Sequence, residues 1–220
     1  MSAPGDADAL PPAPEVQQVE VGLLQNFCEI LHCPATGEAA VVDPAWEVDR
    51  LLREAARLGV RIAKVLVTHT HIDHIEGVEA LVAATGATVH VHPHEAAALA
   101  AVAAHIVRVG DRQDIAIGRC GVRALETFGH TAGGVSFLGD GFVVTGDVLF
   151  VGGCGRTDFP GGDPVAMWRS LQRLGALPEE TRVYPGHDYG STPTSTIARE
   201  LLENRYLRCA TVEELLALRR

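Results

Sequence analysis

Four potential metal ligands follow an apolar run in the first third of the chain. The run IAKVLV occupies residues 62–67, and the segment after it, THTHIDH, contains His69, His71, Asp73 and His74. Such a run is typical of a buried strand, and open α/β folds place ligand sites at the carboxyl ends of buried strands. A single histidine at a strand end is commonly an ordinary polar residue. If no metal were bound, three imidazoles and one carboxylate packed so closely would repel one another or lack hydrogen-bond partners. The segment is therefore better explained as a set of metal ligands.

The spacing of these four side chains also suggests how many ions they hold. A tight loop can aim residues i and i+2 at one point, while residues i+4 and i+5 face a second point nearby. Two adjacent ions are therefore compatible with one segment. Imidazole nitrogen and carboxylate oxygen suit Zn²⁺, and also Fe²⁺ or Mn²⁺.

The rest of the sequence alternates between strand-like and helix-like patterns. Turn residues separate β-branched segments between residues 16 and 43, which predicts antiparallel strands. Helices are predicted at 47–59, 75–86, 93–105 and 163–175, with two more at the end of the chain. Further strands are predicted at 62–68, 87–91, 113–118, 121–127, 134–139, 142–146 and 181–185. This interleaving predicts an α/β fold of two sheets covered by helices on their outer faces.

Length and composition limit the organisation of the chain. With 220 residues and 47% hydrophobic content it can bury one substantial core, so we expect a single domain over residues 16–220. Residues 1–15, MSAPGDADALPPAPE, are expected to form a disordered tail, because this mixture of Pro, Ala and Asp offers little to bury.

Charge and cysteine content limit the partners. A formal net charge of -10 disfavours binding to nucleic acid and to anionic membranes, so a small soluble substrate is expected. No apolar run approaches the ~20 residues of a membrane helix, and the first residues lack the pattern of a secretory signal. Five cysteines without a C-x-x-C pair fit reduced thiols and a cytoplasmic location. A homodimer is one assembly that the sequence allows.

Three further segments share the pattern of an apolar strand, a turn of small residues and a candidate ligand. They are TFGHTAGG with His130, VVTGDVLF with Asp147 and RVYPGHDYG with His187. Each alone is a weak signal, whereas their occurrence together with THTHIDH is a strong one. No G-x-S-x-G motif is present, so serine hydrolysis has no support.

With H-x-H-x-D-H followed by GHT, GD and GH, the chain resembles the metallo-β-lactamase superfamily over nearly all of its length after the tail. The resemblance implies a four-layer αββα sandwich with metals at one edge. The segments GCGRTDFPGGD and YPGHDYGSTPTST look like the branch that contains glyoxalase II-like thioesterases and persulfide dioxygenases. Carried over position by position, the resemblance implies His69, His71 and His130 on a first metal, Asp73, His74 and His187 on a second, and Asp147 bridging both.

Two reactions fit this resemblance. The first is hydrolysis of a thioester such as a hydroxyacylglutathione by a metal-bound hydroxide, with two divalent ions, preferably zinc, and with Asp73 and Asp147 as catalytic carboxylates. The second is oxidation of glutathione persulfide by one Fe(II), held by His69, His130 and Asp147. Glyoxalase II itself carries a helical domain after its last histidine, and the sequence after His187 is short for such a domain. A short hydrolase or a dioxygenase fits better, and hydrolysis is placed narrowly ahead.

Other polar residues have supporting or neutral interpretations. Arg156 and Tyr189 are candidates for substrate binding, Arg156 either by anchoring glutathione or by pairing with Asp158 to shape its loop. Asp43 is a candidate acceptor for the second ring nitrogen of a ligand histidine. The HVHPH segment at 90–94 and the thiol of Cys154 are expected to be structural, since neither has matching partners in the sequence.

Overall fold

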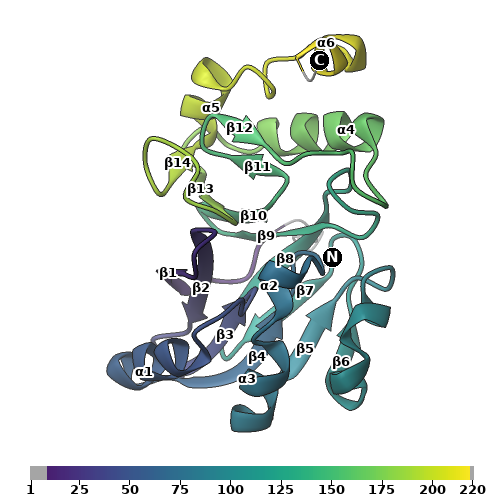
Figure 1. Cartoon of the computed structure of the whole chain (residues 1–220). Coiled ribbons are helices and arrows are strands. Elements are labelled where there is room, and N and C mark those ends of the chain that lie inside the picture. Colours follow the sequence, from purple (N-terminus) through teal and green to yellow (C-terminus); the bar gives the residue numbers. More distant parts are fainter. Residues whose placement is uncertain (1–8, 219–220) are drawn as a thin grey trace, which may run out of the picture.

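The computed structural model describes residues 9–218 and consists of four layers. Two sheets face each other in the middle. Helices α1 (Val48–Leu58) and α3 (Val78–Thr85) cover one outer face, and α4 (Pro164–Gly175), α5 (Ile197–Glu203) and α6 (Val212–Ala217) cover the other (Figure 1). The predicted αββα sandwich is therefore confirmed.

The first sheet is built from the first half of the chain. Its spatial order is β1 (Glu15–Val21), β2 (Asn26–His32), β3 (Glu38–Val42), β4 (Arg61–Leu66), β5 (Thr88–Val91) and β6 (Ile106–Arg108). The first three strands are antiparallel, as predicted, while β3 to β6 run parallel to one another. The carboxyl end of β4 therefore lies between two parallel neighbours, where a loop is rigidly anchored.

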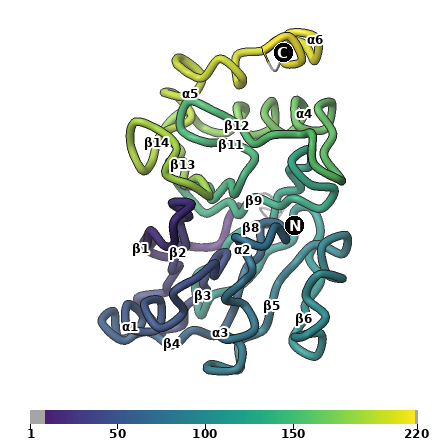
Figure 2. The backbone as a smooth tube through the Cα atoms, viewed as in Figure 1, coloured from purple at the N-terminus to yellow at the C-terminus, as the bar shows by residue number. Residues whose placement is uncertain are grey.

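The second sheet comes from the second half of the chain (Figure 2). Its order is β14 (Ser195–Thr196), β13 (Arg182–Pro185), β10 (Phe142–Gly146), β9 (Val135–Gly139), β8 (Cys120–Glu126) and β7 (Asp114–Ile117). Within this second sheet, as far as the structure describes it, only β10 and β13 pair in parallel, and a ribbon of β11 (Leu149–Phe150) and β12 (Gly153–Cys154) lies beside them. The second half thus delivers its loops to the same edge as the loop after β4.

Three apolar clusters hold the layers together. One lies between the first sheet and α1 and α3, with Leu51 and Leu81 fully buried. A second fills the space between the two sheets around Phe137, and a third joins the second sheet to α4 and α6 through Leu171 and Leu215. At ~25 cal/mol per Å² of buried apolar surface, these clusters are the main source of stability.

Two sequence predictions differ from the structure. The alanine-rich segment 93–105 forms 3₁₀ turns over η1 (Ala96–His105), with breaks at Leu99 and Val102, in place of an α-helix. These two residues, three apart, are the buried ones in η1, and a three-residue repeat suits 3₁₀ geometry better than an α-helix.

The second difference concerns the expected tail. Residues 1–8 lie outside the described part of the chain. Residues 9–14, however, run along β8, where Gly121 N–H donates to Pro12 O at 3.0 Å and Arg123 donates to Ala9 O at 3.1 Å. Strand β1 begins at Glu15. Backbone pairing with β8 orders residues that composition alone assigned to the tail.

No helix within residues 9–218 is long and apolar enough to cross a membrane.

Candidate metal centre

The loop after β4 carries the THTHIDH segment into the space between the two sheets. His69 and His71 lie in the loop, and the short helix α2 (Ile72–Ile75) carries Asp73 and His74. Loops after β8, β10 and β13 bring His130, Asp147 and His187 to the same place. The structure therefore gathers all seven predicted ligands.

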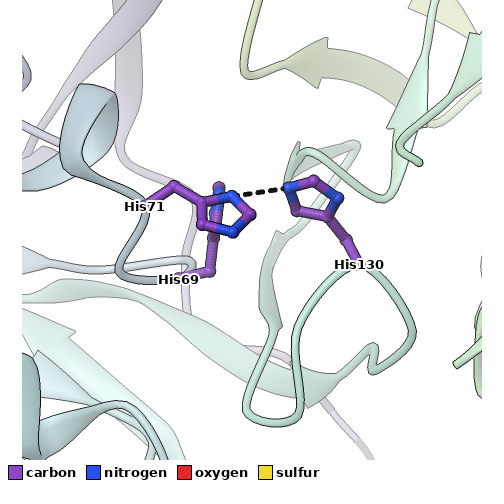
Figure 3. A group of neighbouring side chains, drawn as sticks. All are labelled: His69, His71 and His130. Carbon is purple, nitrogen blue, oxygen red and sulfur yellow. Dashed lines mark hydrogen bonds between the residues drawn. The ribbon is translucent and has the colours of Figure 1, made fainter. Parts of the chain in front are cut away.

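The first ligand group is formed by three histidines. His71 Nδ1 lies 3.1 Å from His69 Nε2 and 2.9 Å from His130 Nε2. Figure 3 shows the His71 and His130 rings approaching from opposite loops, with His69 beside them. Three nitrogen atoms converge on one point, as a tetrahedral zinc site with an open fourth position requires.

The second group contains Asp73, His74 and His187. His187 Nε2 lies 3.2 Å from His74 Nε2 and 3.4 Å from Asp73 Oδ2. His74 Nε2 is 3.7 Å from the same carboxylate oxygen. The two groups are those that the sequence predicted, and their role as ligands stays a prediction.

Asp147 lies between the groups. Its Oδ2 is 3.5 Å from both His130 Nε2 and His187 Nε2, and its Oδ1 is 3.3 Å from His74 Nε2. Gly186 packs so closely that an added Cβ would lie 2.5 Å from Asp147 Oδ1. This close approach explains the glycine of the GH motif.

The ring nitrogens that face away from the centre are held by the protein. His130 Nδ1 donates to Arg156 O at 2.8 Å, His187 Nδ1 to Leu24 O at 2.9 Å, and His74 Nδ1 to Asp43 Oδ2 at 2.9 Å. These bonds leave the Nε2 lone pairs turned inward, which is how protein partners orient metal-binding histidines. The predicted contact between Asp43 and a candidate ligand histidine is thus present.

The converging atoms require a positive charge between them. Neutral His74 and His187 would point two lone pairs at each other across 3.2 Å. Asp147 Oδ1 is buried without a hydrogen bond to any described residue, because its approach to His74 lacks hydrogen-bond geometry. Buried acceptors without partners are unfavourable. The donor set therefore fits divalent cations of the zinc or iron type.

The carboxylates of the centre shift the pKa values of the histidines beside them. Burial by itself lowers the pKa of His74, but the carboxylates of Asp147 and Asp43 outweigh burial and hold it well above its usual range. Burial also lowers the pKa of His187, yet the carboxylates of Asp147 and Asp73 outweigh burial and raise that pKa to about 9. Burial raises the pKa of Asp73, but the hydrogen bond with His187 and the other interactions of this carboxylate together outweigh burial, and the pKa falls to about 2. A metal ion at this centre would compete with protons for the same ring nitrogens.

Asp43 also fixes the loop that carries His69. Its carboxylate accepts from Thr68 N at 2.7 Å and from Thr68 Oγ1 at 2.5 Å. Because the Thr68 hydroxyl donates to Asp43, it accepts from His69 Nδ1 at 3.0 Å. Asp43 itself adopts a left-handed φ of 43°, a conformation that these bonds stabilise. Although Asp43 lies within reach of His69 and His74, its oxygens are already engaged.

A sequence model described as the Metallo-beta-lactamase superfamily matches residues 22–187. The chain belongs to this superfamily. It is 32% identical over 197 residues to "Probable polyketide biosynthesis zinc-dependent hydrolase BaeB" of Bacillus velezensis, with 88% of each chain covered. It is 43% identical over 169 residues to a hydroxyacylglutathione hydrolase of Fuscovulum blasticum, covering 76% of this chain and 64% of that protein.

A comparison with solved structures supports the same family. The ETHE1 structure from Myxococcus xanthus superposes on this member of the metallo-β-lactamase superfamily with a TM-score of 0.84 at 35% identity, covering 93% of this chain and 89% of that one.

A cleft of about 740 Å³ opens over the metal centre of this metallo-β-lactamase fold. Its walls are largely apolar, formed by Leu24, Trp46, Ile72, Phe150, Phe159 and Tyr189. Tyr189 stacks on His187 with ring centroids 4.5 Å apart, and Phe159 meets the edge of His71 at 5.4 Å. The candidate ligands thus form the floor of a site that can hold an organic molecule.

Arg156 is the one Lys or Arg among the described residues that line the cleft. Its guanidinium binds Asp158 through Nε–Oδ1 at 2.6 Å and Nη2–Oδ2 at 2.5 Å, and lies 4.1 Å from the centre of the Phe159 ring. The pairing that the sequence suggested is present. Arg156 and Tyr189 both line the cleft, and their role in substrate binding stays a prediction.

Two supporting residues were missed by sequence reasoning. Glu95 accepts from Thr70 N at 3.1 Å, from the Thr70 hydroxyl, and from Gly133 N at 3.1 Å, so it joins the loops that carry His71 and His130. Asn26 Nδ2 donates to Asp73 O at 3.0 Å and to its carboxylate at 3.3 Å. No spacing in the sequence signals either contact.

The histidines of the HVHPH segment make structural contacts. His92 Nε2 lies 3.3 Å from Glu126, His94 binds Ala132 O at 3.0 Å, and His90 contacts Thr88 at 3.2 Å. None of the three joins a potential ligand group within residues 9–218.

Proposed function

We propose that this protein is a metal-dependent hydrolase of the glyoxalase II-like type, which cleaves a thioester such as a hydroxyacylglutathione. The observation that carries the proposal is the carboxylate of Asp147, 3.3 Å from His74 Nε2 and 3.5 Å from His130 Nε2. A carboxylate in this position is suited to hold two ions side by side. The printed names of a zinc-dependent hydrolase and of a hydroxyacylglutathione hydrolase among the relatives support the same reaction class.

His69, His71 and His130 would hold one zinc ion and Asp73, His74 and His187 a second, and Asp147 would be available to both. When bound, two such ions polarise a carbonyl and activate water at neutral pH. Nitrogen-rich sets with one or two carboxylates are typical of catalytic zinc.

The chain itself positions the candidate ligands and supplies apolar walls beside them. Asp73 stays ionised at neutral pH, because its pKa is about 2, and Asn26 holds its orientation. The aromatic rings of Phe159 and Tyr189 pack directly on candidate ligand histidines and limit their movement. Apolar walls of this kind favour the apolar part of an organic substrate next to the candidate ligands.

Arg156 is the residue that tests whether glutathione is the thiol carrier of the substrate. Glutathione carries carboxylates, and Arg156 is the one Lys or Arg among the described residues that line the cleft. If it anchors glutathione, Arg156→Met should raise KM for a glutathione thioester roughly 10-fold, as expected for a charged hydrogen bond of about 1.5 kcal/mol. KM for the matching N-acetylcysteamine thioester, which has no carboxylate, should not change. Equal effects on both substrates would rule out the anchor.

The deciding experiment for the reaction combines metal analysis with two assays. Protein purified without added metal should contain about two zinc-like ions per chain and release free thiol from a hydroxyacylglutathione. Oxygen uptake on glutathione persulfide should stay at background. About one iron per chain together with oxygen consumption would overturn hydrolysis.

Oxidation of glutathione persulfide by a single iron is the second candidate, and its support is the similarity to the ETHE1 structure. His69, His130 and Asp147 would hold that iron as two histidines and one carboxylate. The two candidates use the same residues but differ in the second ion, so His74 and His187 are the residues that discriminate between them.

A further inference from the structure

A pair of cysteines joins the two sheets at the end opposite the metal centre. Cys33 follows the last residue of β2 in the first sheet, and Cys120 opens β8 in the second. Strand β2 begins at Asn26, which contacts Asp73, and β8 runs on toward His130. At ~3.3 Å per residue, each strand places its cysteine roughly 20 Å from the ligand end.

The two sulfur atoms lie in direct contact. Cys120 Sγ donates to Cys33 Sγ at 2.9 Å, although the residues are 87 positions apart in the chain. A disulfide bond requires ~2.05 Å, so the atoms need to approach by less than about 1 Å. The two cysteines are far apart in the sequence, so the packing of the two sheets is what brings their sulfur atoms together.

The surrounding turns hold this geometry. Gly37 N and Thr36 N donate to Cys33 O at 2.9 and 3.2 Å, and Gly118 N donates to Glu38 Oε1 at 3.2 Å. A Cβ at Gly118 would collide with the Thr36 hydroxyl, so the glycine permits the two turns to meet. Cys33 has no exposed surface beneath this turn, whereas Cys120 is partly exposed.

The pair also differs chemically from other thiols of the chain. The hydrogen bond from Cys120, with that of Thr36, lowers the pKa of Cys33 to about 6, and burial raises that of Cys120 to about 11. The opposite directions of the two shifts agree with the contact, in which Cys120 is the donor and Cys33 the acceptor. Burial raises the pKa of Cys28 and of Cys209, which makes both unreactive in the folded protein.

We propose that Cys33 and Cys120 are a redox-active pair, which a low-molecular-weight disulfide such as oxidised glutathione converts into a disulfide bond between the two sheets. Cys120 Sγ, the exposed sulfur, attacks the small disulfide while its proton passes to Cys33, and one small thiolate leaves. Cys33 then loses that proton to the thiolate and attacks Cys120 Sγ, which releases the second small thiolate. The two cysteines lose two electrons and the small disulfide gains them.

The test uses the full-length protein in glutathione buffers of graded redox poise. After acid quenching, alkylation of free thiols and proteolysis, mass spectrometry should find the Cys33 and Cys120 peptides joined by a disulfide bond. Cys28 and Cys209 should be alkylated only after unfolding. Cys154→Ser should still form the bond, whereas Cys33→Ser, which lacks both the proton acceptor and the second thiol, should form no linked peptide. Absence of the linked peptide in the most oxidising buffer would overturn the proposal.

Thermal unfolding provides the second measurement. A bond that closes a loop of this length constrains the unfolded chain, so oxidation should raise Tm by roughly 5–15 °C. Cys120→Ser should show no shift between the oxidising and reducing buffers. A linked peptide without a rise in Tm would mean that the bond forms only in unfolded molecules, and would also overturn the proposal. Neither readout requires hydrolase activity, and the metal content is measured and kept equal in the two buffers.

Discussion

His74 occupies a position where the two candidate reactions make different demands. Its Nε2 faces His187 and both carboxylates of the centre, while its Nδ1 binds Asp43. Under the hydrolase proposal, His74→Ala should reduce bound metal from about two ions per chain to about one. Thioester hydrolysis should fall by at least ~10²-fold, the scale of a lost electrostatic contribution to catalysis. Metal analysis and steady-state kinetics on the same preparation check both numbers.

A single iron that is unchanged in His74→Ala, with a loss of only ~10-fold, would support the dioxygenase. In that case His74 would act as a supporting partner, not as a ligand. Thr88→Val, which alters a contact of His90 away from the centre, is a suitable control.

Glu29 is a second residue with a measurable consequence, because it is buried with one weak partner, Gln18, at 3.3 Å. Burial raises the pKa of Glu29 from 4.5 to about 8. A raised folded-state pKa gives stability that is complete below about pH 4.5 and is lost as pH rises through 8. The free energy of unfolding of Glu29→Gln should therefore rise relative to that of the wild type between pH 5 and 9, by an amount on the order of a few kcal/mol.

Urea unfolding at several pH values measures that difference. Glu20→Gln, at an exposed position of the neighbouring strand β1, should show no pH-dependent gain. A gap between wild type and Glu29→Gln that stays constant from pH 5 to 9 would contradict the argument.

At the scale of elements, the start of α4 connects a helix to the metal centre. Asp163 accepts from Val165 N at 2.7 Å and Ala166 N at 3.1 Å, and its own N–H donates to Gly129 O beside His130. Removal of such a cap costs about 1 kcal/mol. Asp163→Ala should lower the free energy of unfolding by that amount, whereas Asp163→Asn, which keeps an acceptor, should lose much less. Equal losses in urea titrations would show that the cap is not the cause.

Helical elements also differ in how well the apolar pattern of their sequence predicts their backbone conformation. The helix α1 and its end at Gly59, with a φ of 69°, follow directly from helical periodicity and a left-handed cap. The alanine-rich η1 has no comparable apolar face, since Leu99 and Val102 are its buried residues. Its backbone is therefore decided by packing against α3 and its flanking strands, and not by alanine's preference for the α-helix.

For the whole molecule, metal ions at this centre would connect the two halves of the chain. The first sheet supplies His69, His71, Asp73 and His74, and the second supplies His130, Asp147 and His187. An ion that binds only the folded state at 100 times its Kd stabilises it by ~2.7 kcal/mol. Removal of metal with a chelator should lower Tm by roughly 5–10 °C.

Differential scanning calorimetry before and after chelation measures this effect. Zinc should restore the original Tm, and magnesium, which prefers oxygen ligands, should not. An unchanged Tm in protein shown by analysis to be free of metal would contradict the assignment of ligands from both sheets.

Much of this protein is determined by local pattern. Most strand and helix positions, the layered fold and the seven candidate ligands are recognisable in sequence, because apolar periodicity and residue type are properties of short segments. His69 and His74 could be predicted from their spacing after β4 for the same reason.

The supporting contacts were decided only by tertiary structure. Glu95 reaches Thr70 and Gly133, Asn26 reaches Asp73, and Cys33 meets Cys120 across 87 positions. Each contact joins segments whose relative position depends on strand order and on how the sheets pack. A single sequence carries the residue types for such contacts, but the distances between them exist only after the two sheets close on a common core.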